Sequence, residues 1–218
     1  MSHRTIIIGD VHGCAEELEA LLDRCAHTAS DEVILAGDLV AKGPDSRRVV
    51  QRARALGARS VKGNHDEHVL RWYRASPTQR QQHSLQPTHR QVVETLEEDD
   101  WAYLAAMPNW IRLSEHRALV VHAGLVPGVP LKAQREEDLL NLRSITKEGA
   151  ASKKVDGGAP WASLWKGPEL VVFGHDAIRG LQQHPFAIGL DTGCCYGRAL
   201  TALLLPGREL ISVPARKA

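Results

Sequence analysis

The segment Ile6-Ile-Ile-Gly-Asp10-Val-His12-Gly-Cys14, close to the amino terminus, constrains the possible folds more than any other part of the chain. Its three consecutive β-branched residues predict a buried strand. Glycines on either side of Asp10 and His12 permit a tight turn where that strand ends. Asp10 and His12 are two positions apart, so an extended segment would direct both side chains to the same side. A carboxylate and an imidazole that converge at a strand end indicate a metal site.

Four later segments repeat this arrangement of an apolar run followed by a polar side chain in a small-residue turn. In open α/β sheets, binding sites form outside the carboxyl ends of the strands. We therefore expect the polar residues of these segments to meet at one site. The candidate metal ligands are Asp10, His12, Asp38, Asn64, His122 and His175.

The composition sets the size and class of the protein. With 218 residues, of which 43% are hydrophobic, the chain can form one domain with a sizeable core over residues 1–218. The net charge of +1 gives no reason to expect a nucleic-acid or membrane partner, and no apolar run is long enough to cross a bilayer. Four cysteines without a CxxC pair, and an amino terminus without a secretory signal pattern, predict reduced thiols and a cytoplasmic protein. The oligomeric state is left open.

The order of the expected elements indicates an α/β fold. Helical spacing of apolar residues over 15–25 and 46–56 alternates with three strands, which is the pattern of a sheet with crossover helices. Residues 67–111 predict a helical cap insertion over the strand ends, with a polar loop at 75–89. The Gly-, Ala- and Lys-rich stretch 147–160 predicts a mobile loop, and two final strands are expected at 200–205 and 210–213.

The candidate ligands favour two metal ions. Oxygen and nitrogen ligands suit hard and borderline divalent ions, so we expect manganese, with iron or zinc as alternatives. Six ligands exceed one structural zinc site but suit two ions that share a bridging carboxylate, and Asp38 is the natural bridge. Two adjacent ions acidify a bridging water and clamp the attacking and leaving oxygens of an in-line displacement. That chemistry is phosphoryl transfer to water.

Other residues are assigned around this centre. His65 follows Asn64, so its ring can face the leaving group and donate a proton to the departing oxygen. Asp66 ends the same motif and is the second candidate catalytic residue, while Lys42 and Arg143 are the cations expected to hold the phosphate. The following are interpreted as surface or packing residues: the arginines between 47 and 59, Cys194, Cys195, and six histidines without a strand-end context, His3, His27, His83, His89, His116 and His184.

Five ordered motifs together resemble the phosphoprotein phosphatase superfamily: Gly9-Asp-Val-His-Gly13, Gly37-Asp-Leu-Val-Ala-Lys-Gly43, Gly63-Asn-His-Asp66, His122-Ala-Gly124 and Gly174-His175. The resemblance implies a sandwich of two mixed β-sheets flanked by helices. It also implies one metal on Asp10, His12 and Asp38, with His65 as general acid. The implied ligands of the other metal are Asp38, Asn64, His122 and His175.

Two positions depart from the protein Ser/Thr phosphatases, which have an Asp where this chain has Ala41 and an Arg where it has Lys42. That Asp orients the catalytic histidine, so the sequence does not show what orients His65. A neutral residue here is typical of symmetrical diadenosine tetraphosphate hydrolases. Segments 141–145, 173–181 and 190–197 look like the related ApaH-like phosphatases, and Tyr196 in the last segment is a further candidate substrate-binding residue.

The activities implied by the resemblance are hydrolysis of dinucleoside polyphosphates or nucleotide-capped ends, including a capped RNA end, and dephosphorylation of phosphoproteins. Our first hypothesis is symmetrical cleavage of diadenosine tetraphosphate into two ADP, since Ala41 and the insertion favour it. The alternatives are a phosphoprotein (Ser/Thr/Tyr) phosphatase and a catalytically inactive binding module, which the intact metal and acid residues disfavour. Trp72 and Tyr73 in the insertion are expected either to stack on a substrate base or to pack the insertion against the body.

Overall fold

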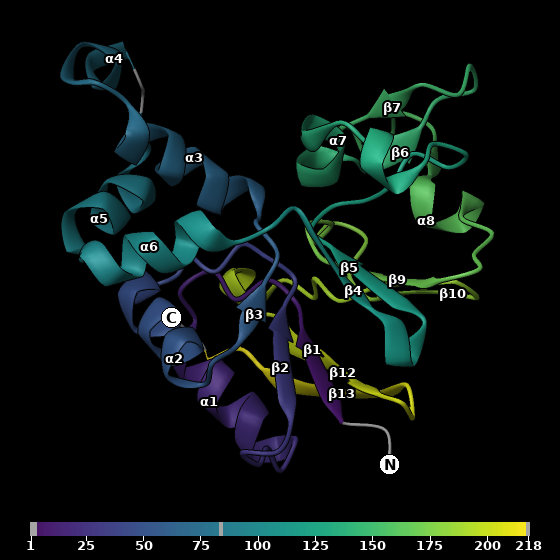
Figure 1. Cartoon of the computed structure of the whole chain (residues 1–218), viewed down its shortest axis with the longest axis horizontal. Coiled ribbons are helices and arrows are strands. Elements are labelled where there is room, and N and C mark those ends of the chain that lie inside the picture. Colours follow the sequence, from purple (N-terminus) through teal and green to yellow (C-terminus); the bar gives the residue numbers. More distant parts are fainter. Residues whose placement is uncertain (1–3, 83–84, 217–218) are drawn as a thin grey trace.

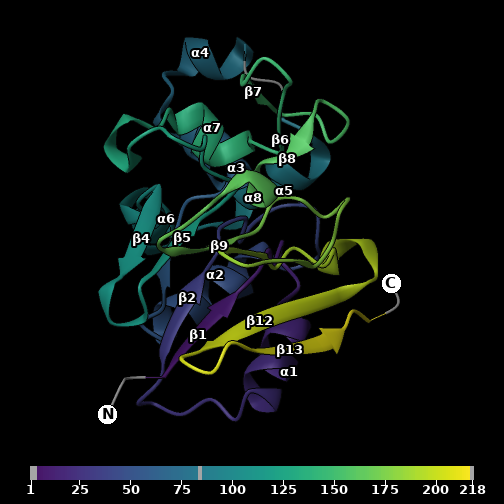
Figure 2. The same cartoon turned by 90° about the vertical axis from the view of Figure 1, so that its right-hand side faces the viewer.

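The computed structural model describes residues 4–82 and 85–216, and two five-stranded mixed sheets form its body (Figure 1, Figure 2). In the first sheet β1, β2 and β3 are parallel and β12 is antiparallel to β1, while in the second β5, β9 and β11 are parallel. This confirms the predicted fold class. The first sheet has the order β13 (Glu209–Pro214), β12 (Ala199–Leu205), β1 (Thr5–Ile8), β2 (Glu32–Leu35), β3 (Arg59–Ser60). The second has the order β10 (Gln182–His184), β11 (Ala187–Gly189), β9 (Leu170–Phe173), β5 (Ala118–Val121), β4 (Trp110–Leu113).

The central strands are apolar on both faces because each sheet is covered on both sides. Ile7 and Ile34 face the second sheet, where they join a buried cluster with Val120 and Val172. Ile6 and Ile8, whose side chains point to the other face of the first sheet, belong to another buried cluster. This cluster includes residues of the helices α1 (Ala15–Arg24) and α2 (Ser46–Ala55). The apolar run at the amino terminus therefore forms a doubly buried strand, which is why it does not alternate with polar residues.

A helical cap lies beside the strand ends, to the upper left in Figure 1. It consists of α3 (Asn64–Arg74), α4 (Pro77–Gln82), α5 (Pro87–Thr95) and α6 (Glu98–Ala106). The insertion was expected at residues 67–111. Its helices instead begin at Asn64, within the Gly63–Asp66 motif, and end at Ala106, before β4 of the second sheet begins at Trp110. The polar stretch 75–89 contains α4 and the start of α5, with Pro87 in the first helical turn, so the expected loop is only partly observed.

Salt bridges and packing fix the cap to the body. The carboxylate of Asp100 on α6 is fully buried and accepts a hydrogen bond from Arg54 of α2 at 2.6 Å. Val92, Trp101 and Leu104 contribute to the same cluster as the first sheet and α1. The cap is therefore continuous with the core rather than a loosely attached lobe.

The stretch 147–160, predicted to be a mobile loop, contains two short strands. β7 (Ala151–Ser152) and β8 (Ala159–Pro160) pair with the two edges of β6 (Ser144–Ile145) in a small third sheet. Gly158 approaches the carbonyl oxygen of Ile145 so closely that a Cβ would lie 2.0 Å from it, which explains the glycine. Two helices flank this sheet, α7 (Glu136–Asn141) and α8 (Trp161–Leu164), and short 3₁₀ helices span Ser114–His116, Leu131–Ala133 and Cys194–Tyr196.

Two further expectations concern membrane spans and thiols. Within the described residues, none of the helices combines the length and apolar character needed to cross a bilayer. All four cysteines are free, and three of them are buried.

Candidate active site

The predicted ligands come together at the carboxyl ends of the strands of both sheets. Asp10 and His12 follow β1, Asp38 follows β2, and Asn64 opens α3 after β3. His122 and His175 follow β5 and β9 of the other sheet. The site therefore lies where the two sheets meet, and every one of these side chains follows the end of a strand.

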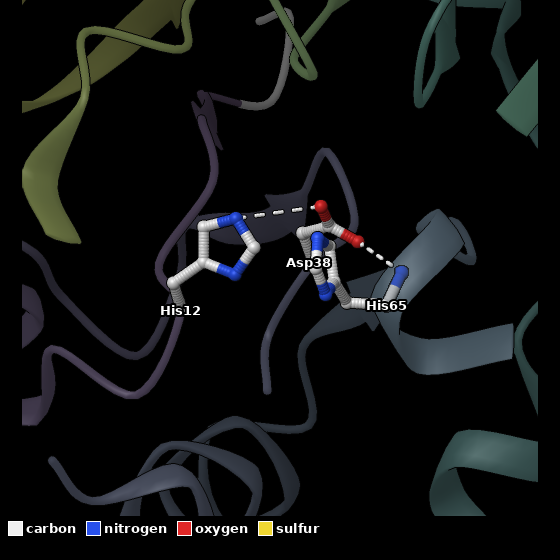
Figure 3. A group of neighbouring side chains, drawn as sticks. All are labelled: His12, Asp38 and His65. Atoms are coloured by element: carbon white, nitrogen blue, oxygen red, sulfur yellow. Dashed lines mark hydrogen bonds and ion pairs between the residues drawn. The ribbon is translucent and has the colours of Figure 1, made fainter. Parts of the chain in front are cut away.

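Asp38 lies at the centre of these ligands, and Figure 3 shows it with His12 on one side and the backbone N–H of His65 on the other. One carboxylate oxygen, Oδ2, is 3.4 Å from Nε2 of His12 and 3.5 Å from Nε2 of His122. The other, Oδ1, accepts the backbone N–H of His65 at 2.9 Å. Burial alone would raise the pKa of Asp38, but the imidazoles of His122 and His12 outweigh it and hold the pKa below its usual value. Asp38 is thus an ionised carboxylate shared by two histidines.

Backbone carbonyl groups orient the two histidines beside Asp38. Nδ1 of His12 lies 3.0 Å from the carbonyl oxygen of Val40, and Nδ1 of His122 lies 2.8 Å from that of Ala36. A carbonyl only accepts, so Nδ1 carries a hydrogen in both rings, and Nε2 is the ring nitrogen that faces Asp38. Burial lowers the pKa of His12 to about 4, which keeps its ring neutral at pH 7. Rings held in this way have the arrangement of metal-ligating histidines.

Asn64 and His175 complete the side of the site that belongs to the second sheet. The amide oxygen of Asn64 lies 3.1 Å from Nε2 of His122 and 3.0 Å from Nδ1 of His175. Nε2 of His175 is buried and has no hydrogen-bond partner in the described part of the chain. Burial also lowers the pKa of His175 well below its usual value. A buried lone pair without a partner is costly unless something absent from the protein atoms, such as a cation, satisfies it.

Asp10 closes the opposite side of the site. Its two oxygens accept the backbone N–H of His175 at 3.0 and 3.1 Å, and Oδ2 is 4.0 Å from Nε2 of His12. A Cβ at Gly174 would lie 1.9 Å from this carboxylate, so only glycine fits there. Burial raises the pKa of Asp10 well above its usual value, and the carboxylates of Asp191 and Asp38 add to the shift. Such repulsion between buried carboxylates favours the binding of a cation.

Asp191 is a residue of the site that the sequence did not single out. It is buried, it faces the cavity, and burial raises its pKa. The signal was present in Leu190-Asp-Thr-Gly193, where an apolar residue after β11 again delivers an Asp into a glycine turn. One oxygen of its carboxylate accepts the backbone N–H of Gly193 at 3.1 Å. This places a sixth strand end at the site.

Asp66, expected to be catalytic, does not face the cavity. It is fully buried, and its two oxygens accept four backbone N–H groups. Asp38 and Gly63 donate to one oxygen at 2.8 and 2.9 Å, and Leu39 and Val40 donate to the other at 3.0 and 3.3 Å. Asp66 thus joins the turn after β2 to the turn that starts α3, and the structure gives it a structural position rather than a catalytic one.

His65 and His89 are paired, which corrects the interpretation of His89 as a surface residue. His89 is only 4% exposed, and its Nε2 lies 2.9 Å from Nδ1 of His65. Burial lowers the pKa of His65 to about 3 and that of His89 to about 4. No sequence signal identifies this pair, because His89 lies in the first turn of cap helix α5 and does not follow a strand. His116, also assigned to the surface, lies 3.0 Å from the hydroxyl of Thr5, whereas His3 and His83 lie outside the described residues.

A cavity of about 340 Å³ opens beside the buried group. It brings together three predicted residues, Lys42, Arg143 and Tyr196, with Arg198 and the exposed side chain of Ile178. Nζ of Lys42 lies 2.9 Å from Nε2 of His12 and 5.4 Å from the centre of the Tyr196 ring. Burial disfavours the charge of this lysine, but the carboxylate of Asp38 and the hydroxyl of Tyr196 outweigh it and raise the pKa of Lys42.

Arg143 is held against the wall of this cavity. Its guanidinium donates to the carbonyl oxygens of Lys153 at 3.0 Å and His175 at 3.2 Å. Trp72 and Tyr73 do not line the cavity: Arg80 lies 4.4 Å from the Trp72 ring, and Tyr73 stacks on Trp101 at 4.3 Å. Of the two possibilities considered for these aromatic residues, the contacts favour packing within the cap.

Residues 3–200 match the family described as calcineurin-like phosphoesterases. The chain belongs to this family. It is 32% identical to a symmetrical bis(5'-nucleosyl)-tetraphosphatase of Chromohalobacter salexigens, with 97% of this chain and 98% of that protein covered. It is 28% identical to the asymmetrical bis(5'-nucleosyl)-tetraphosphatase PrpE of Bacillus subtilis, with 96% and 93% covered. A crystal structure of a protein proposed to be a diadenosine tetraphosphatase superposes with a TM-score of 0.89 at 42% identity, covering 100% of this chain and 96% of the other.

Calcineurin-like phosphoesterases use a dinuclear metal centre, and the residues of this chain fit one. Three groups of described side chains have ligand atoms that all lie within 4.8 Å of one another, and Asp38 belongs to two of them. The donors in these two groups are carboxylate and imidazole, with no thiolate, which suits divalent ions of the first transition row. The partnerless Nε2 of His175 points to the same conclusion. The two groups are His12, Asp38 and His65, and Asp38, His122 and His175.

Proposed function

We propose that this protein hydrolyses dinucleoside polyphosphates and cleaves diadenosine tetraphosphate symmetrically into two ADP. The observation that carries the proposal is the cavity beside the paired histidines and aspartates. Three cations line it, Lys42, Arg143 and Arg198, together with two exposed apolar side chains, Tyr196 and Ile178. A chain of phosphates needs several cations, and a nucleobase needs a flat apolar surface. A phosphoserine on a peptide would need fewer cations and no surface for a base.

The proposed ligands are those expected from the sequence: Asp10, His12 and Asp38 for one ion, and Asp38, Asn64, His122 and His175 for the other. We propose manganese at both positions, with iron or zinc as alternatives. Bound there, two divalent ions would lower the pKa of a water and neutralise charge on the phosphoryl group. Asp38 would then be the ligand common to both.

The remaining roles belong to the protein's own side chains. The water oxygen attacks a phosphorus next to the central bridging oxygen, the bond from that phosphorus to the bridge breaks, and one water is consumed for two ADP formed. As the proposed general acid, His65 lines the cavity beside Asn64 and directs a hydrogen on Nε2 at the departing oxygen, and a proton released by the attacking water replaces any that the ring gives up. Arg143 and Lys42 hold the phosphates, and Tyr196 contacts a base.

The relatives include symmetrical and asymmetrical enzymes, so the products decide the cleavage mode. We expect the manganese-loaded protein to convert diadenosine tetraphosphate to ADP alone, as resolved by anion-exchange chromatography. AMP with ATP would show that the substrate is bound one phosphate further along. Rapid hydrolysis of a phosphoserine or phosphotyrosine peptide, with diadenosine tetraphosphate left intact, would replace the proposal by a protein phosphatase activity.

Replacing Arg143 with Ala should affect the dinucleotide more than a small ester. Each lost charge-assisted hydrogen bond to a phosphate removes about 1.5–3 kcal/mol of binding. We therefore expect the KM for diadenosine tetraphosphate to rise about tenfold or more, with a smaller change for 4-nitrophenyl phosphate. Arg135→Ala, an exposed arginine paired with Glu137, is the matched control and should leave both values unchanged. Equal increases for the two substrates would mean that Arg143 binds only the phosphoryl group under attack.

A further inference from the structure

We propose that His89 is the positioning residue of His65, a role that protein Ser/Thr phosphatases give to an aspartate. The ring of His89 would hold the His65 ring in place and keep its hydrogen on Nε2, the nitrogen that must reach the leaving oxygen. This inference rests on the role of His65 proposed above. It assigns a function to a cap residue that lies outside all the strand-end motifs.

The geometry of the pair is that of a direct ring-to-ring hydrogen bond. Nδ1 of His65 and Nε2 of His89 are 2.9 Å apart, and the two rings are nearly parallel, with an interplanar angle of 6° and ring centres 5.0 Å apart. A third imidazole, His68 on α3, lies against His89 with ring centres 4.6 Å apart. Ala41, which is fully buried where the protein phosphatases have their aspartate, has no side-chain atom that could accept a hydrogen bond.

The other ring nitrogen of His89 determines the direction of this hydrogen bond. Nδ1 of His89 is buried and has no hydrogen-bond partner among the residues that the structure describes. Buried N–H groups without an acceptor are rarer than acceptors that remain incompletely satisfied. The hydrogen of a neutral His89 therefore belongs on Nε2, from which it is donated to Nδ1 of His65. A neutral His65 that accepts at Nδ1 must carry its own hydrogen on Nε2.

Packing of the cap makes this contact rigid. His89 lies on α5, and Val92, one turn later on the same helix, is 1% exposed within the main core cluster. α3, which carries His65, starts at the strand-end motif itself. Because α3 and α5 belong to one cap, the orientation of His65 depends on the cap being folded. The cap therefore contributes to the chemistry and does not only enclose substrate.

The test is a double-mutant cycle on the manganese-loaded protein with phenyl phosphate and 4-nitrophenyl phosphate, whose leaving groups differ in their need for a proton. We expect His89→Leu to lower kcat for phenyl phosphate by about tenfold or more, with little change in KM and a smaller loss for the nitrophenyl ester. When His65 is already Asn, adding His89→Leu should cost less than about twofold, because residues that act as one unit are not additive. His89→Gln, which keeps a hydrogen-bonding group, should restore most of the activity.

Two controls separate positioning from loss of structure. Val92→Ala should loosen the same helix and lower Tm, but leave the ratio of kcat for the two esters unchanged. Long-range ¹H–¹⁵N spectra of the metal-free protein should show His65 with its hydrogen on Nε2, and a tautomer mixture in His89→Leu. Additive losses in the cycle, or a hydrogen on Nδ1 of His65 in the unmodified protein, would overturn the role of His89. If His65→Asn slowed the hydrolysis of both esters equally, the proposed acid role of His65 would be wrong. The role of His89, which rests on it, would then also be wrong.

Discussion

Replacement of Asp38 by Asn is expected to remove both metal ions and to reduce turnover more than any other single substitution in the site. Its Oδ2 lies within 3.5 Å of both His12 and His122, so one carboxylate supplies the negative charge for both positions. Asn keeps the shape but loses the charge. Loss of a residue that only supports a ligand typically costs about 10–100-fold in metal affinity or activity, so loss of the shared ligand should exceed that range. Metal content after dialysis and turnover of diadenosine tetraphosphate are the two measurements.

A matched control removes another buried carboxylate far from the site. Asp100 is also fully buried, and its charge is paired with Arg54 within the cap and α2. Asp100→Asn should lower the stability of the protein but leave its metal content unchanged. If Asp38→Asn retained two bound ions per chain, Asp38 would not be the bridge. If Asp100→Asn lost the ions to the same extent, metal loss would simply report unfolding.

The strand ends were predictable because two independent sequence signals mark each of them. An apolar run such as that at Ile6–Ile8 identifies a buried strand, and a polar residue between small residues identifies its carboxyl end. Parallel strands of one sheet bring their carboxyl ends to one edge, so Asp10 and Asp38 could be placed together without knowing the pairing, whereas the meeting of this edge with His122 depends on how the second sheet packs against the first. Periodicity also predicted the final hairpin, β12 and β13.

The features that the sequence did not predict depend on contacts between residues that are far apart in the chain or on pairings too short to leave a pattern. His89 lies in a polar helix, and only the packing of α5 against α3 brings it to His65. Asp66 stands beside the candidate acid in the sequence, yet α3 turns its side chain away from the cavity and towards the backbone of residues 38–40. The stretch 147–160 has the composition of a linker, but it contains two short strands that pair with β6. Such pairings of two residues leave no periodic pattern to detect.

Replacing Asp66 with Ala should have the largest effect on stability. The change leaves four buried backbone N–H groups without their acceptor, and each unsatisfied donor costs about 1–3 kcal/mol. Partial relaxation and entry of water reduce the sum, so we expect a loss of about 3–5 kcal/mol in the free energy of unfolding. Urea denaturation of the metal-free protein measures this loss without a contribution from bound ions.

Ser46→Ala is the matched control for this prediction, because its hydroxyl accepts a single backbone N–H, that of Ala41, at 2.9 Å in the same region. It should cost about 1 kcal/mol. Because the turn after β2 carries Asp38, Asp66→Ala should also weaken metal binding in the protein that remains folded, while His65 keeps its partner on α5. A variant as stable as the Ser46→Ala control, but with turnover abolished, would instead show that Asp66 acts directly in catalysis, as its place in the motif first suggested.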